Sequence, residues 1–124
     1  YNIDYSKLDK VPKLRLVRLM SDEMSKNIKL PMKLDEITEL TRIYSYNTSI
    51  IIIKKLDMNN VKLKKIWKEK RNKVIQNMLK IDSQTICYNP VWKYMIYKRN
   101  IIPEFNYLDM NNKPLFRYTI EIKD

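Results

Sequence analysis

The sequence contains no glycine, no histidine and no alanine, and it has a single cysteine, Cys87. Without histidine the chain lacks the side chain that most readily exchanges a proton near neutral pH. Without glycine it has no loop of the kind that lets a backbone approach phosphate closely. One cysteine excludes an internal disulfide framework and a cysteine-based zinc cluster. We therefore expect a protein that is not an enzyme and holds no cofactor or metal.

Long hydrophobic runs are also missing. The longest is Ile50–Ile53, far short of the roughly 20 apolar residues that cross a bilayer. We therefore expect no transmembrane segment. The chain begins at Tyr1 instead of Met, and we expect its N-terminus to be processed or truncated, as removal of an organellar presequence would explain.

Positive charge is what the chain has in excess. Its 124 residues include 25 Lys and Arg against 14 Asp and Glu, which gives a net charge of +11. This length predicts a single small basic domain spanning residues 1–124. Such a charge attracts polyanions, namely nucleic acid, an acidic membrane surface or an acidic protein. Lys, Ile, Asn and Tyr are also the residues of AT-rich codons, so codon drift is a second explanation of the lysine excess.

Two helices are predicted in the first third of the chain. In residues 11–28 apolar side chains recur at helical spacing behind Pro12, which suits a first helical turn. After Pro31 a similar spacing resumes from Leu34 to Tyr44, behind the acidic Asp35 and Glu36. The expected apolar face of the first helix consists of Leu14, Val17, Met20, Met24 and Ile28.

One strand and one long helix are predicted in the middle of the chain. The β-branched run Ile50–Ile53 is bounded by polar residues, which favours a buried strand. From about Asn59 to Ile81 a single apolar stripe predicts an amphipathic helix of about six turns with a basic back. Asn59 or Asn60 is a suitable N-cap. The expected stripe consists of Leu63, Ile66, Trp67, Val74, Met78 and Ile81.

The C-terminal third predicts a hairpin. Two alternating runs, residues 105–108 and 115–122, flank turn-forming residues 109–114. The preceding stretch from Val91 to Arg99 fits either a helix or a strand. The predicted fold class is therefore α+β and mostly helical, with a long central basic amphipathic helix, one Ile-rich strand and a C-terminal β-hairpin.

Cationic residues on the long helix and in the later aromatic stretch are the candidate nucleic-acid contacts. Lysines along one helix can neutralise phosphates without reading sequence. In the aromatic stretch, Trp92, Tyr94 and Tyr97 are candidates for stacking on unpaired bases, although Trp92 and Trp67 are better explained as core residues. The candidate nucleic-acid-binding residues are Lys62, Lys64, Lys65, Lys68, Arg71, Lys73, Lys93, Lys98 and Arg99.

Two other groups suggest chemistry less strongly. Asp35, Glu36 and Glu39 form the only tight acidic group, which is better explained as the solvated start of a helix than as a Mg²⁺ or paired-carboxylate site. Cys87 has no histidine to activate it, so we expect an inert, buried thiol.

The function that these features predict is a non-catalytic, RNA-contacting structural subunit of a large ribonucleoprotein, with a mitochondrial or other organellar ribosomal protein as first choice. Its expected partners are RNA, chiefly ribosomal RNA, and neighbouring proteins, with no small-molecule substrate, and its expected location is the organellar matrix or else the cytoplasm. The main alternative is an accessory protein-interaction subunit of an organellar complex without RNA contact. A DNA-associated or viral scaffold protein and a fragment of an enzyme are further alternatives.

Overall fold

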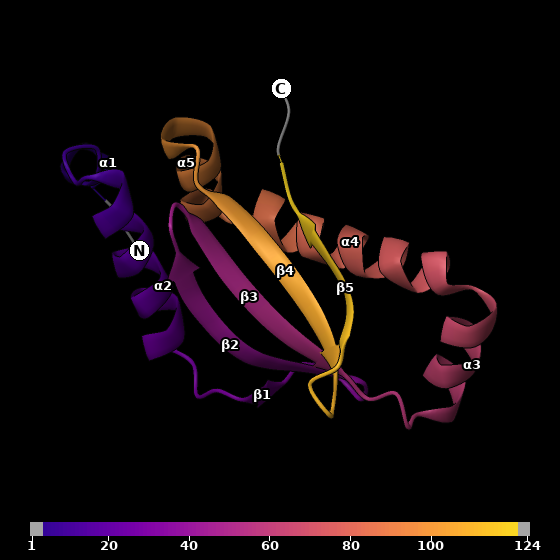
Figure 1. Ribbon diagram of the computed structural model, residues 1–124. Coiled ribbons are helices and arrows are strands. Elements are labelled where there is room, and N and C mark those ends of the chain that lie inside the picture. Colours follow the sequence, from indigo (N-terminus) through magenta and orange to yellow (C-terminus); the bar gives the residue numbers. More distant parts are fainter. Residues whose placement is uncertain (1–3, 122–124) are drawn as a thin grey trace.

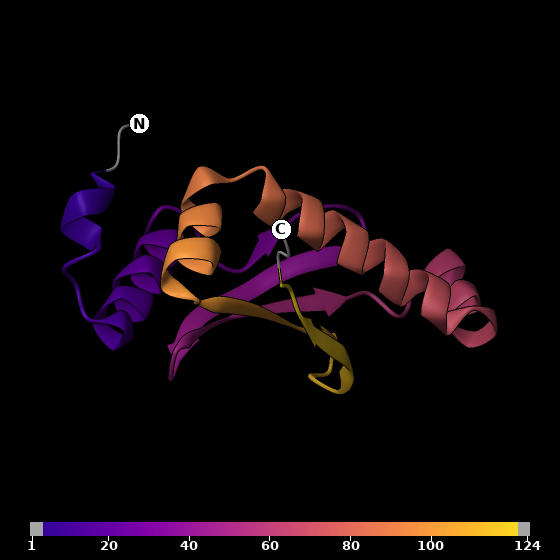
Figure 2. The same cartoon turned by 90° about the horizontal axis from the view of Figure 1, so that it is seen from above.

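The computed structural model describes residues 4–121, which form a five-stranded mixed sheet with helices on one face (Figure 1). Figure 2 shows the helices on the same side of the curved sheet. The helices are α1 (Tyr5–Leu8), α2 (Lys13–Lys26), α3 (Val61–Glu69), α4 (Arg71–Cys87) and α5 (Pro90–Arg99). The strands are β1 (Met32–Lys33), β2 (Thr38–Tyr46), β3 (Ser49–Leu56), β4 (Ile102–Asp109) and β5 (Pro114–Thr119).

The strands lie in the order β1-β2-β3-β4-β5. Neighbouring strands are antiparallel except the central pair, in which β3 and β4 run parallel, with Ser49 beside Ile102 and Leu56 beside Asp109. A parallel pair requires a long crossover connection. Here α3, α4 and α5 supply it, so three helices lie between the two central strands in sequence.

The isoleucine-rich strand β3 occupies the middle of this sheet. Alternate residues Ile50, Ile52 and Leu56 are buried beneath the helices, as the period of two in a strand requires. Helix α2 covers the β2–β3 side with the fully buried Leu16 and Val17. Helix α4 contributes Val74, Met78 and Ile86 to the same core.

The predicted helix at Leu34–Tyr44 is wrong, because this segment forms the turn after β1 and most of β2. The central strand β3 needs a partner strand along each edge to satisfy its backbone hydrogen bonds. Thr38, Thr41, Ile43 and Tyr44 are β-branched or aromatic residues that suit such a strand, and β2 pairs with β3 from Thr38 to Tyr46. The apparent helical spacing of apolar residues in this segment therefore misled the prediction.

The predicted continuous helix from Asn59 to Ile81 is also wrong. Lys70, with φ −141° and ψ 57°, separates α3 from α4. A straight helix covering both would be about 40 Å long, whereas an eight-residue strand spans about 26 Å. The break at Lys70 redirects α3 across the end of the sheet, where the ring of Trp67 stacks on that of Phe116 at 5.8 Å.

The C-terminal strands β4 and β5 pair antiparallel, but they do so as two members of the larger sheet. Helices account for 46% and strands for 28% of the structure, so the predicted fold, mostly helical with one strand and a separate hairpin, is wrong. Ile122, the last residue of the predicted hairpin, lies outside the described residues. The ambiguous stretch Val91–Arg99 forms α5, which begins at the N-cap Asn89 and ends at Asn100 with a left-handed backbone.

Candidate protein-binding groove and basic segment

An apolar groove lies where α1, α2 and α5 meet. Its volume is about 450 Å³, within the usual size of a ligand pocket. Most of its lining is aliphatic or methionine, and Glu23 is its one charged residue. The lining residues are Leu8, Leu19, Met20, Glu23, Met24, Asn27 and Val91.

The groove exists because the sheet does not cover the whole apolar face of α2. Leu16 and Val17 are fully buried. Met20 and Met24 lie on the same face and are only partly buried, and Leu19, at the side of this face, is 41% exposed. Leu14, predicted to belong to the buried face, is 55% exposed instead. Leucine and methionine side chains that stay partly exposed in a groove are typical of surfaces that bind other proteins, since methionine adapts its shape to different partners.

One wall of the groove is fixed by polar contacts between α5 and the N-terminal segment. The guanidinium of Arg99 donates hydrogen bonds to the carbonyl oxygens of Leu8, at 2.6 Å, and Val11. The hydroxyl of Tyr94 donates to the carboxylate of Asp9, and the Tyr94 ring lies 4.6 Å from that of Tyr5. Burial, followed by the hydrogen bond to Asp9, raises the pKa of Tyr94. These contacts hold α1 in place although it has only four residues.

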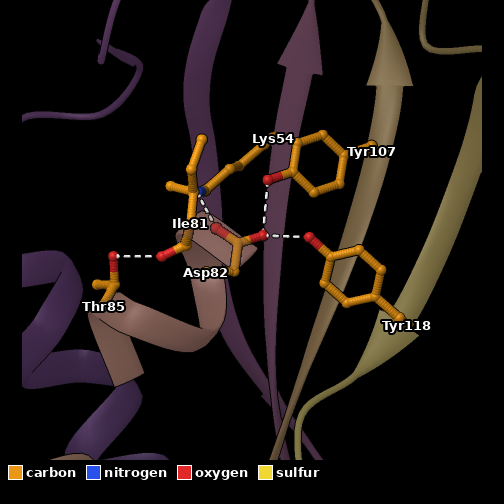
Figure 3. Close-up of polar contacts among 6 residues, drawn as sticks. All are labelled: Lys54, Ile81, Asp82, Thr85, Tyr107 and Tyr118. Atoms are coloured by element: carbon orange, nitrogen blue, oxygen red, sulfur yellow. Dashed lines mark hydrogen bonds and ion pairs between the residues drawn. The ribbon is translucent and has the colours of Figure 1, made fainter. Parts of the chain in front are cut away.

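A second feature, a buried polar cluster, lies beneath α4 (Figure 3). The fully buried carboxylate of Asp82 accepts hydrogen bonds from the ammonium of Lys54 at 2.6 Å, the hydroxyl of Tyr107 at 2.6 Å and the hydroxyl of Tyr118 at 2.5 Å. Burial, followed by the proximity of Asp82, raises the pKa of both tyrosines. The cluster thus ties α4 to β3, β4 and β5.

The geometry of this cluster suits a structural role. Both oxygens of Asp82 accept hydrogen bonds from protein donors, and Asp82 is fully buried. Buried charges are normally paired and hydrogen-bonded in this way. This cluster was not predicted from the sequence, although Asp82 follows Val74 and Met78 at intervals of four residues, and Lys54 takes the inward position after Ile50 and Ile52.

Three solved structures share the fold. No protein-family model matches the sequence, and no curated protein matches it significantly. The pilotin EpsS of the Vibrio vulnificus type 2 secretion system superposes with a TM-score of 0.62 at 13% identity, covering 88% of this chain and 91% of that one. The type II secretion system pilotin AspS of Vibrio cholerae gives 0.62 at 11% identity, covering 95% and 96%. The chain has a pilotin-like fold.

The third structure, a Pseudomonas aeruginosa protein described as secreted, gives a TM-score of 0.64 at 11% identity and covers 90% of this chain and 94% of that one. None of the three is described as a ribosomal or RNA-binding protein. The prediction of an RNA-contacting ribosomal subunit with ribosomal RNA as its partner is therefore wrong. The predicted organellar matrix location is also wrong, because the pilotin-like neighbours are bacterial secretion or secreted proteins.

In the pilotin-like fold the nine candidate cationic contacts fall into two separate groups. Those at positions 62–73 lie on α3 and the start of α4, whereas Lys93, Lys98 and Arg99 lie on α5, at the other end of the sheet (Figure 1). Arg99 is engaged with the carbonyls of Leu8 and Val11. The structure therefore does not bring these residues into one cationic surface.

The aromatic candidates are divided between core and surface. Trp92 and Tyr94 are buried, so they cannot stack on an external ring, whereas Tyr97 is exposed. Trp67 is half-buried against Phe116, with the Arg71 guanidinium 4.6 Å from its ring centre. The core interpretation of Trp92 fits this placement.

The remaining candidates are the acidic group beginning at Asp35 and the thiol of Cys87. Asp35 uses its carboxylate to accept hydrogen bonds from the backbone N–H groups of Ile37, at 2.9 Å, and Thr38, at 2.7 Å, and so stabilises the turn before β2 instead of starting a helix. Cys87 ends α4 as a half-buried free thiol. In residues 4–121 no helix is both long and apolar enough to cross a bilayer.

Proposed function

We propose that the protein is a non-enzymatic accessory subunit of a bacterial protein-secretion assembly, in which it binds a segment of another protein through the groove between α1, α2 and α5. The observation that carries this proposal is a fold shared over nearly the whole chain with two pilotins of type 2 secretion systems. The absence of histidine from the sequence fits a role in binding.

The groove supports a helical or extended segment with two or three apolar side chains as the ligand. A hollow of about 450 Å³ accommodates a few aliphatic side chains but is small for a folded domain. Helical ligands present their apolar anchors at intervals of three and four residues to such grooves. Glu23, at the rim, favours a basic residue next to these anchors.

Peptide binding to the full chain tests this proposal. Labelled peptides are tiled across the secretion-apparatus proteins encoded in the same genome, and their affinity is measured by fluorescence anisotropy. We expect one segment, apolar on one face, to bind at micromolar affinity or tighter, and Leu19→Glu to weaken that binding at least tenfold, because the introduced carboxylate would have to be desolvated.

Leu14→Glu is the matched control. Leu14 and Leu19 are both exposed leucines of α2, at 55% and 41%, but only Leu19 lines the groove. Leu14→Glu should bind as the unmodified protein does. Equal loss of affinity in both variants, or no binding by any tiled segment, would contradict the proposed function.

A further inference from the structure

The segment 61–73, called here the basic segment, holds much of the positive charge of the molecule. It carries seven cations, Lys62, Lys64, Lys65, Lys68, Lys70, Arg71 and Lys73, and one acid, Glu69. All eight side chains are exposed. Among residues 4–121 the only ion pairs are Lys26–Glu23 and Lys54–Asp82, so none of these cations is paired with an acidic side chain of the described chain.

Helix α3 presents part of this charge in a fixed arrangement. Its first turn is capped by Asn60, whose side chain accepts a hydrogen bond from the N–H of Leu63 at 3.1 Å. Leu63 is buried and Trp67 packs on Phe116, so the opposite side of α3 faces outward. At 100° per residue, Val61, Lys65 and Lys68 lie on that outward side, and Lys64 lies on its flank, about 60° from Val61.

Apolar side chains stand among these lysines. Val61 is 80% exposed and lies one helical turn from Lys64 and Lys65, while Ile66 is 42% exposed on the flank of α3. Helix α3 also lies at one extreme end of the molecule (Figure 2). A short helix with lysines around exposed aliphatic residues has the composition of a surface that rests on a bilayer, with its lysines among the phosphates and its apolar tips at the acyl boundary.

We propose that α3 binds the surface of an anionic phospholipid membrane, with Lys64, Lys65 and Lys68 contacting lipid phosphates and Val61 entering the headgroup layer. The charge of the lysines favours an anionic membrane as the partner. The exposed side chain of Val61 favours a membrane over an acidic protein, which would complement the lysines but not the apolar valine. The contact is peripheral, and it does not depend on occupation of the groove between α1, α2 and α5.

Sedimentation of the full chain with vesicles tests the proposal. We expect binding to phosphatidylcholine vesicles that contain phosphatidylglycerol, loss of binding as salt rises, and none to phosphatidylcholine alone. Each lysine near an anionic surface contributes about a fivefold factor, so Lys64→Ala, Lys65→Ala and Lys68→Ala together should lower the partition coefficient on the order of 100-fold. Val61→Ser should lower it a few-fold without changing the charge.

A second triple variant with the same net charge is the matched control. Lys10, Lys29 and Lys93 are exposed and lie outside the basic segment, so their replacement by alanine should lower partitioning far less. A fluorophore on Val61→Cys in a Cys87→Ser background should shift to shorter wavelength on anionic vesicles. Equal losses in both triple variants, or binding of poly-glutamate but not of anionic vesicles, would overturn the proposal.

Discussion

Replacing Asp82 tests how the helical layer is held to the sheet. In the Asp82→Ala variant the ammonium of Lys54 and the hydroxyls of Tyr107 and Tyr118 lose their shared acceptor while they remain buried or half-buried. Removing one partner of a buried ion pair costs about 3–5 kcal/mol. Because domains of this kind are stable by about 5–15 kcal/mol in total, the variant should lose a large part of its stability.

The same reasoning predicts that removing the whole cluster costs less than removing Asp82 alone. In the quadruple variant Lys54→Met, Asp82→Leu, Tyr107→Phe and Tyr118→Phe no buried polar group is left without a partner, and such replacements are often neutral or stabilising. Tyr118→Phe alone should cost about 1 kcal/mol, since Asp82 keeps two donors. Free energies of unfolding come from urea titrations followed by circular dichroism.

A cost below about 1 kcal/mol for Asp82→Ala would refute this account of the cluster. So would a loss of stability in the quadruple variant that equals the sum of the losses in its four single substitutions. Additive losses would mean that the four side chains contribute independently, and that burial of the carboxylate is not compensated by its three donors.

Two further predictions concern pH and packing. Burial next to Asp82 raises the pKa of Tyr107 and Tyr118 above the ordinary 10.0. Above pH 10 the unfolded state therefore loses tyrosine protons that the folded state keeps, so the free energy of unfolding should fall as pH rises. Urea titrations from pH 9 to 11 should show a shallower fall for the double variant Tyr107→Phe, Tyr118→Phe. An equal fall in both proteins would contradict this assignment to the two tyrosines. Ile86→Ala should cost about 2–5 kcal/mol, whereas Ile81→Ala, at a position 50% exposed, should change stability by about 0.5 kcal/mol or less. Thermal unfolding of the two variants shows whether α4 buries Ile86, as the structure has it, or Ile81, as the sequence pattern predicts.

The parts of the fold that the sequence predicts are those with local signals. Asn60 caps α3 and the isoleucine run lies in β3, because caps and β-branched runs act through neighbouring residues. The segment from Thr38 to Tyr46 is a strand only because β3 lies beside it, and that information is not local. The break at Lys70 likewise depends on the length of the sheet that α3 and α4 must cover.

The candidate site was harder to predict than the fold. The excess of lysine is apparent from the composition, but the separation of the lysines between α3 and α5 depends on the sheet topology. On α2 the groove is lined by Met20 and Met24, which periodicity assigns to the core, and by Leu19, which it does not. A helix pattern alone cannot show that the neighbouring α1 leaves part of this face uncovered. Asp82 lies just beyond the predicted helix, which ends at Ile81, because an acidic residue beside an apolar stripe looks like a solvated position unless its buried partners are known.

The parallel pairing of β3 with β4 determines how the chain must assemble. The hairpin of β2 and β3 can form early, but the other edge of β3, with Ile50, Ile51 and Ile52, has no partner until β4 has been synthesised, since Ser49 pairs with Ile102. At ordinary translation rates this interval lasts a few seconds. During it an unpaired, isoleucine-rich edge is open to pairing with other chains, so the nascent protein is more prone to aggregate than the finished one.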